Sequence, residues 1–162
     1  MKAIVAADKN WGIGKDNNLL VSIPSDMKNF RALTLGNVVV MGRKTFESLP
    51  NQAPLEERDN IVITKDKNFK AKGVTLVHSL EELDKELEGF DDDRVFVIGG
   101  GSIYKQLIDR CDEVYVTKIN YSYKADTYFP DLDNNADWKL VYESEEHTYF
   151  DIEYTFTRYK RV

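Results

Sequence analysis

The sequence contains few of the residues that form disulfides, bind metals or build histidine-based catalytic sites. Its 162 residues include one cysteine, Cys111, and two histidines, His78 and His147. A disulfide framework needs paired cysteines, and zinc sites and nucleophilic triads draw on clusters of Cys and His. We therefore expect no disulfide and no metal. The chemistry of this chain should come from carboxylates and a bound cofactor.

Long apolar runs and an excess of positive charge are also missing. The apolar run at residues 3–7 stops at Asp8 and is too short for a membrane span or a signal peptide. The formal net charge of −6 and the pI of about 5.0 argue against a surface that binds nucleic acid. We expect a cytoplasmic monomer that binds neither membranes nor nucleic acid.

Runs of β-branched apolar residues alternate with helical patterns along most of the chain. Buried strands are predicted at 3–7, 38–41, 61–64, 75–77, 95–98 and 114–119. Helices are predicted at 25–33, 43–49, 80–87 and 102–108, the third with Ser79 as its N-cap and Glu82 as the capping-box partner. Alternating stretches at 138–144 and 149–159, around the polar residues 145–147, predict a C-terminal antiparallel hairpin. The pattern indicates one α/β domain over residues 1–162.

Asp26 is the residue that the local pattern marks most clearly. Pro24 and Ser25 indicate a helix start, and Asp26, Phe30 and Leu33 then share one face of that helix. The simplest explanation of the acid is a favourable interaction with the helix dipole. The alternative is a proton donor or substrate anchor in an apolar pocket, with a pKa raised by desolvation and lowered by the dipole.

Two junctions between a predicted strand and a predicted helix have the composition of a phosphate site. Ile98-Gly99-Gly100-Gly101-Ser102 allows close approach of the backbone and directs free N–H groups at an anion. Met41-Gly42-Arg43-Lys44-Thr45 adds two cations and a hydroxyl, and Lys65 follows another strand. Neither matches the GxGxxG or P-loop pattern, and a glycine junction alone is commonly a tight turn. Together they favour a dinucleotide, with the 2′-phosphate of NADPH at the cationic junction.

The order and spacing of several motifs resemble the bacterial dihydrofolate reductases over essentially the whole chain. The motifs are Trp11-Gly12-Ile13-Gly14 with Asn18-Leu19, Ile23-Pro24-Ser25-Asp26-Met27-Lys28-Asn29-Phe30, Met41-Gly42-Arg43-Lys44-Thr45-Phe46-Glu47-Ser48-Leu49-Pro50 with Pro54-Leu55 and 58–64, Ile98-Gly99-Gly100-Gly101-Ser102-Ile103-Tyr104, and Asp126-Thr127-Tyr128-Phe129-Pro130. The resemblance implies an eight-stranded, mostly parallel sheet with a C-terminal antiparallel hairpin, flanked by four helices. It also implies hydride transfer from NADPH to carbon 6 of 7,8-dihydrofolate with protonation at nitrogen 5, which supplies tetrahydrofolate to one-carbon metabolism.

The resemblance also assigns roles to individual residues. Asp26 would be the only ionisable side chain on the pterin and would promote protonation of nitrogen 5 through water, supported by Thr117. Substrate and antifolate inhibitors would contact Val5, Ala6, Leu19, Val21, Met27, Phe30, Leu49, Leu55 and Arg58, the last as a planar fork for the α-carboxylate of the glutamate tail. NADPH would contact Ala7, Ile13, Gly14, Gly42, Arg43, Lys44, Thr45, Thr64, Lys65, Gly99, Gly100, Gly101, Ser102 and Tyr104. The family's cis peptide would join Gly99 and Gly100.

The chain departs from the family pattern at several positions. Leu20-Val21 replaces Pro-Trp, which removes an indole N–H that holds a water in the family's active site. Ala125 and Ser102 stand where glycine and arginine are frequent, and Glu56 and Glu57 precede Arg58.

Two other functions fit parts of the pattern. A reductase of the same fold acting on another heterocycle, such as the pyrimidine reductases of flavin synthesis, would need more cations around a ribosyl phosphate. A nucleotide-binding module without catalysis would have no use for an inward Asp26. The spacing from Asp26 to Phe30, together with Arg58, favours dihydrofolate.

Overall fold

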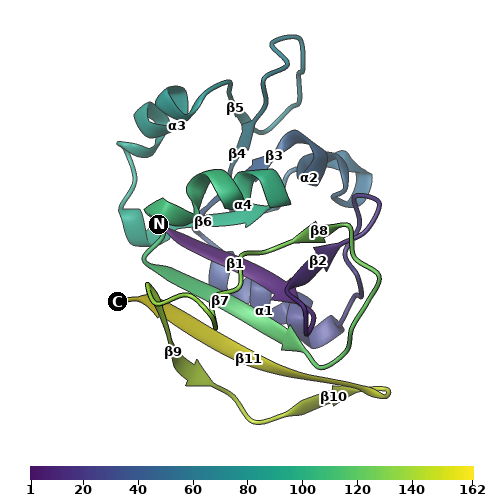
Figure 1. Ribbon diagram of the computed structural model, residues 1–162. Coiled ribbons are helices and arrows are strands. Elements are labelled where there is room, and N and C mark those ends of the chain that lie inside the picture. Colours follow the sequence, from purple (N-terminus) through teal and green to yellow (C-terminus); the bar gives the residue numbers. More distant parts are fainter.

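The computed structural model describes residues 1–162 and contains one large sheet (Figure 1). The strand order is β10-β11-β7-β1-β6-β3-β4-β5. The parallel strands are β1 (Lys2–Ala7), β3 (Val38–Gly42), β4 (Asp59–Ile63), β5 (Thr75–Val77), β6 (Val95–Gly99) and β7 (Glu113–Ile119). The antiparallel part is β11 (Ile152–Arg161), with β9 (Trp138–Glu143) and β10 (His147–Tyr149) paired to successive parts of it. Because β9 and β10 share one edge, the sheet is eight positions wide, and the predicted fold class is confirmed.

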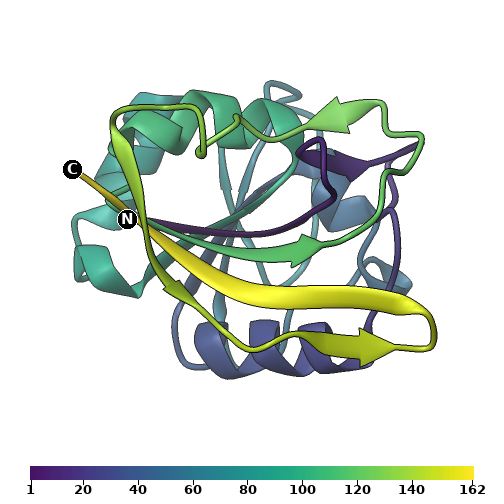
Figure 2. The ribbon, with the colours of Figure 1, turned by 60° about the horizontal axis from the view of Figure 1, so that its bottom comes forward.

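The helices lie on both faces of this sheet. They are α1 (Pro24–Thr34), α2 (Arg43–Glu47), α3 (Leu80–Leu87) and α4 (Gly101–Leu107), with short 3-10 turns η1 (Pro50–Gln52), η2 (Asp92–Arg94) and η3 (Ile108–Arg110). Figure 2 shows α1 below the sheet and α4 above it. The four helices were predicted, although α2 ends before the expected residue 49. None of them has the combination of length and apolar composition that crossing a membrane requires.

The start of α3 follows the predicted capping pattern only in part. The hydroxyl of Ser79 accepts a hydrogen bond of 3.1 Å from the N–H of Glu82, as an N-cap does. The carboxylate of Glu82, however, accepts from the N–H of His78 and not from that of Ser79. The reciprocal bond of the capping box is therefore displaced by one residue.

The C-terminal region reverses direction at a different place from the one predicted. Strands β9 and β11 pair antiparallel, but residues 145–147 are not the tight turn, because His147 already begins β10. The chain turns at Phe150, whose φ is 54°. A second, two-stranded sheet joins β2 (Gly12–Gly14) and β8 (Thr127–Tyr128). It was not predicted, because strands this short show no recognisable alternation.

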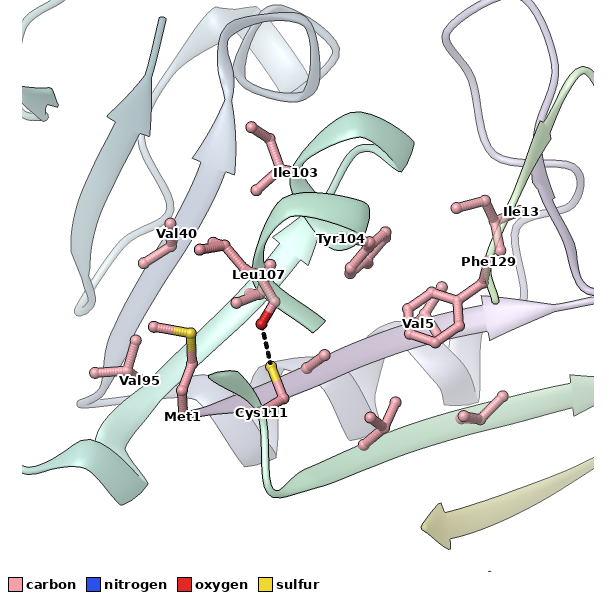
Figure 3. Packing of buried hydrophobic residues seen from close by; sticks show 14 of the residues in the cluster. Met1, Val5, Ile13, Val40, Val95, Ile103, Tyr104, Leu107, Cys111 and Phe129 are labelled. Atoms are coloured by element: carbon pink, nitrogen blue, oxygen red, sulfur yellow. Dashed lines mark hydrogen bonds between the residues drawn. The ribbon is translucent and has the colours of Figure 1, made fainter. Parts of the chain in front are cut away.

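Alternation along the buried strands divides the core between the two faces of the sheet. The main cluster has 23 buried residues, including Val38, Val40 and Leu107 of α4. Figure 3 shows part of it, with Val5 beside Phe129 and the thiol of Cys111 donating to the carbonyl of Leu107. The face that α1 covers has two smaller clusters. We call them the β3 cluster, formed by Val39, Met41, Phe46 and Val62, and the β7 cluster, formed by Ile23, Ile119 and Tyr154.

Candidate active site

The two glycine junctions meet at the edge where the parallel strands end. Strands β3 and β6 are neighbours, and they end at Gly42 and Gly99. A Cβ atom on Gly42 would lie 3.0 Å from Cγ1 of Ile103, and one on Gly100 would lie 3.3 Å from Oγ1 of Thr45. Each junction therefore packs against the helix that follows the other. We call Gly42, Gly99, Gly100 and Gly101 together the glycine cradle.

The glycine cradle fits a dinucleotide. Neither α2 nor α4 has a side chain that caps its first turn, so the first N–H groups of these helices are left for a ligand. The peptide between Gly99 and Gly100 is cis, as the resemblance implies. Arg43 and Lys44 begin α2, and Lys65 is exposed just after β4. N–H donors beside a group of cations suit a pyrophosphate and a further phosphate.

Other residues of the predicted cofactor set differ in whether their polar groups are free to bind a ligand. The hydroxyl of Tyr104 donates to the carbonyl of Ile4 at 2.6 Å, and burial raises the pKa of this phenol. Only the ring of Tyr104 is therefore left to support the cradle. Thr64 is buried, and its hydroxyl accepts from the N–H of Asp66 at 3.1 Å. Ala7 ends β1, Thr45 lies in the first turns of α2, and Ile13 is buried in the main cluster. Gly14 is linked to the cradle through Thr127, because Cβ atoms on Gly14 and Gly101 would lie 3.8 Å and 2.5 Å from side-chain atoms of Thr127. Lys44 and Ser102 are exposed.

His78 was not predicted as a site residue. Its Nδ1 lies 2.8 Å from the carbonyl oxygen of Thr64, so the imidazole stands next to the strand end that precedes Lys65. The available signal was its position directly after the parallel strand β5, because such strand ends meet at one edge.

Asp26 points toward the sheet from the first turn of α1. The hydroxyl of Thr117 on β7 donates to Oδ1 of Asp26 at 2.6 Å. Burial raises the pKa of Asp26 above its usual value, and the hydrogen bond from Thr117 partly opposes this rise. Strand register places Thr117 between Ala6 and Phe156. A carboxyl group held in this way can bind an N–H donor and take part in proton transfer.

Contacts with the β7 cluster fix the start of α1. Ile23 precedes the helix and is buried in that cluster, and the hydroxyls of Ser25 and Tyr154 share a hydrogen bond. Because α1 has no side-chain N-cap, these contacts determine where its first turn lies. Val21 is half-buried against the same cluster. The position of Asp26 thus depends on strand β11 as well as on its own helix.

The remaining apolar residues of the predicted substrate set differ in burial and in the cluster that they contact. Ala6 and Phe30 are half-buried on its face of the sheet, and Leu49 and Leu55 pack against the β3 cluster. Leu19 and Met27 are 59% and 47% exposed. Val5 differs from the others, because its side chain lies in the main cluster on the opposite face. Only the main chain of Val5 can therefore face the site.

Arg58 is held against the end of α1 with one terminal nitrogen free. Its Nε donates to the carbonyl of Glu56 at 2.9 Å, and its Nη1 donates to the hydroxyl of Thr34 at 3.1 Å. The guanidinium lies 6.0 Å from the ring centre of Phe30. The carboxylate of Glu57 pairs instead with Arg31 at 3.2 Å. The acids before Arg58 therefore leave its Nη2 without a hydrogen-bond partner in the chain.

Contacts that the sequence did not reveal anchor the loop after β2. The N–H of Asp16 donates to Asp126 at 2.9 Å, and the side chain of Asn17 donates to the carbonyl of Lys44 at 3.1 Å. A further contact orders the segment before β2, where the buried carboxylate of Asp8 accepts from the N–H of Gly12 at 2.8 Å. Asp126 begins one of the family motifs, but the spacing of the sequence does not indicate that it bonds to Asp16. For Asp8, the only signal was an acid directly after a buried strand.

Comparison with known proteins decides the family, because residues 1–161 match the family model described as "Dihydrofolate reductase". The chain belongs to the dihydrofolate reductase family. The dihydrofolate reductase of Bacillus subtilis (strain 168) is 41% identical over 145 residues, which cover 90% of this chain and 83% of that protein. The dihydrofolate reductase of Staphylococcus aureus (strain N315) is 37% identical over 141 residues, which cover 87% and 84%.

A solved structure supports the same assignment. Dihydrofolate reductase from Enterococcus faecalis, complexed with NADP(H) and RAB-propyl, has a TM-score of 0.86 and 34% identity, and the match covers 99% of this chain and 95% of that one. The predicted family and enzyme class are confirmed, and the activity is the NADPH-dependent reduction of dihydrofolate. The alternatives of a pyrimidine reductase and of a non-catalytic binding module are set aside.

Proposed function

We propose that this chain reduces 7,8-dihydrofolate to 5,6,7,8-tetrahydrofolate with Asp26 as the residue that promotes protonation of nitrogen 5. The observation that carries the proposal is the 2.6 Å hydrogen bond from Thr117 to Asp26, in surroundings that raise the pKa of the carboxyl group. NADPH, when bound, supplies the hydride that reduces carbon 6. The other requirements of the reaction fall to the residues of the chain.

Asp26 acts through its charge and its fixed position. The carboxylate accepts N–H groups of the pterin ring and favours the protonated form of nitrogen 5, with a water passing the proton. Partial burial strengthens this interaction, because less water screens the charge. The hydrogen bond from Thr117 fixes one carboxylate oxygen and leaves the other free for the substrate.

The rest of the substrate is held by apolar contacts and one cation. Ala6, Val21, Met27, Phe30, Leu49 and Leu55 form the apolar walls, with Leu19 at the entrance and the main chain of Val5 beside Ala6. Arg58 binds the α-carboxylate of the glutamate tail through Nη2, while Thr34 and Glu56 hold the remainder of its guanidinium. A charge-assisted contact of this kind contributes about 1.5–3 kcal/mol.

The cofactor lies along the glycine cradle in this proposal. N–H groups at Gly100 and Gly101 would bind the pyrophosphate, and Arg43, Lys44 and Lys65 would supply positive charge for the 2′-phosphate. The remaining members of the set, Ala7, Ile13, Gly14, Gly42, Thr45, Thr64, Gly99, Ser102 and Tyr104, line or support the same surface. The cations predict a preference for NADPH over NADH.

The proposal treats residues 1–162 as one domain that acts as a monomer in the cytoplasm. The apolar run near the N-terminus supports the single domain, because it forms β1 between β6 and β7 at the centre of the sheet. Sedimentation of the purified protein over a range of concentrations tests the monomer.

Asp26→Asn tests the catalytic assignment. The amide keeps a polar group of the same size but carries no charge, so we expect turnover at neutral pH to fall by about 10²- to 10⁴-fold. NADPH binding should be unchanged, and part of the activity should return at low pH, where solvent protonates dihydrofolate. Asp109→Asn, an exposed position in η3, is the matched control. Wild-type turnover in Asp26→Asn at neutral pH would refute the assignment.

A further inference from the structure

Arg43, the first residue of α2, already has an anionic partner in this chain. Its Nη1 donates a hydrogen bond of 2.7 Å to Oε1 of Glu47, and both side chains are about one-third exposed, at 35%. The two residues are four positions apart on a helix, the spacing at which side chains meet. Glu47 makes no other hydrogen bond, so Arg43 is the only group that this carboxylate engages.

The proposed role of Arg43 and the observed pair make competing demands on the same guanidinium. A phosphate and a carboxylate both bind arginine through parallel N–H donors, and a guanidinium presents only a limited number of them. A 2′-phosphate that approaches Arg43 therefore meets the negative charge of Glu47 beside it. Either Arg43 leaves Glu47, or the phosphate and the carboxylate share one cation at close range.

We infer that Glu47 is a specificity-determining residue that weakens binding of a ribose 2′-phosphate at Arg43 and so narrows the preference for NADPH over NADH. The inference rests on the proposed function, because it takes Arg43 as the reader of that phosphate. In this view the nearby cations create the preference for NADPH, and Glu47 opposes it. A ligand with a free 2′-hydroxyl carries no charge at this point and is unaffected by the competition.

No other carboxylate is paired with the cations of the predicted 2′-phosphate site. Lys44 and Lys65 add positive charge, and neither forms a salt bridge in the structure. Asp66, which follows Lys65, accepts the N–H of Asn68 at 2.9 Å and so belongs to its own turn. Glu47 is thus the one carboxylate bonded to a cation of the predicted 2′-phosphate site.

Glu47→Gln isolates the charge, because glutamine keeps the length and the helix propensity of the side chain. Binding of adenosine 2′,5′-bisphosphate and of adenosine 5′-phosphate is measured by calorimetry on the full chain without substrate, and NADPH and NADH are compared by fluorescence titration. We expect affinity for the bisphosphate and for NADPH to rise by about fivefold, which corresponds to the largest effect of an exposed ion pair. Affinity for adenosine 5′-phosphate and NADH, which lack the 2′-phosphate, should not change. The gain should shrink as salt is added.

Two further variants separate the possible failures. Asp84→Asn removes the carboxylate of the Asp84–Arg110 pair, far along the chain from α2, and should leave all four affinities unchanged. Arg43→Ala should weaken the bisphosphate and NADPH selectively. If Arg43→Ala does so but Glu47→Gln fails to tighten these ligands, or weakens them, the role of Glu47 is wrong and that of Arg43 stands. If Arg43→Ala affects all four ligands equally, the assignment of Arg43 itself is wrong, and this inference is overturned with it.

Discussion

The hydroxyl of Thr117 donates to Oδ1 of Asp26 at 2.6 Å across 91 positions of the chain. This hydrogen bond joins the first turn of α1 to the middle of β7, and it acts on the pKa of Asp26 against the effect of burial. The pKa of this carboxyl group is therefore adjusted by a neutral side chain on the sheet. A substitution at Thr117 should therefore change the pKa of Asp26 while leaving the carboxyl group itself in the protein.

Thr117→Val should raise the pKa of Asp26 further. Valine has nearly the shape of threonine but cannot donate, so the effect that lowers the pKa is lost while burial remains. The acidic limb of the pH profile should therefore move to higher pH, because only the effect of burial on the pKa of Asp26 remains. The pH dependence of kcat/KM for dihydrofolate reports it, with Thr117→Ser as the control that keeps the donor. A profile of Thr117→Val that coincides with that of the wild type would contradict the coupling.

Asp26→Asn should stabilise the folded protein at neutral pH. Because the folded state raises the pKa of Asp26, it binds this proton more tightly than the unfolded chain, whose carboxyl has the usual value of 3.8. The stability from this group is complete below 3.8 and is lost as the pH rises through the raised value. Above the raised pKa the partly buried carboxylate is therefore a net cost to stability, and asparagine removes this cost.

Thermal unfolding at several pH values measures this effect. For a chain of this size each 1 kcal/mol raises Tm by about 2–4 °C. The Tm advantage of Asp26→Asn should shrink as the pH is lowered toward 3.8. An advantage that is the same at all pH values would mean that the carboxyl charge is not its source.

Arg58→Lys should weaken binding of the glutamate tail specifically. Lysine keeps the positive charge but loses the planar fork, and it cannot hold Thr34 and the carbonyl of Glu56 while presenting a further nitrogen. We expect KM for dihydrofolate to rise about tenfold with little change in kcat, as for loss of one charge-assisted contact. A dihydropterin without the tail should show no change. An equal rise in KM for both substrates would place the defect in the pterin site.

The elements that sequence could predict are those in which local pattern and burial agree. The β-branched runs in β3 and β6 are buried on both faces, so their composition alone indicates parallel strands. The direction of Asp26 followed from its spacing to Phe30, because helical periodicity is local. The hydrogen-bond partner of Asp26 could not be predicted from a local pattern. Thr117 was available only through resemblance to a family, since no local rule connects residues so far apart.

The same limit explains the parts that could not be predicted. Val5 and Ala6 were grouped together as walls of the site, but neighbouring residues in a strand face opposite ways, and only the packing of α4 and α1 shows which way each one faces. The salt bridge between Arg43 and Glu47 has a recognisable helical spacing, yet the spacing does not say whether an external phosphate competes for it.

The position of Val21 leads to the last prediction, which concerns inhibitors. Val21 stands where the family usually has tryptophan, and it is half-buried against the β7 cluster, which Ala6 also contacts. Trp11 does not compensate for the missing indole. It is buried in the main cluster, with its ring 6.2 Å from that of Phe129 and under Lys118 at 5.5 Å. Position 21 therefore presents neither the bulk of an indole ring nor its N–H donor.

Val21→Trp should restore both and strengthen binding of trimethoprim, a small diaminopyrimidine antifolate. One hydrogen bond of about 1 kcal/mol gives less than a tenfold gain, and the added apolar contact increases it. Inhibitor affinity and kcat/KM for dihydrofolate are measured beside the wild type, with unfolding curves to verify the fold. Val141→Trp, on the exposed strand β9, is the control for adding an indole elsewhere. If Val21→Trp folds normally and trimethoprim binds no more tightly than to the wild type, Val21 does not weaken this end of the site.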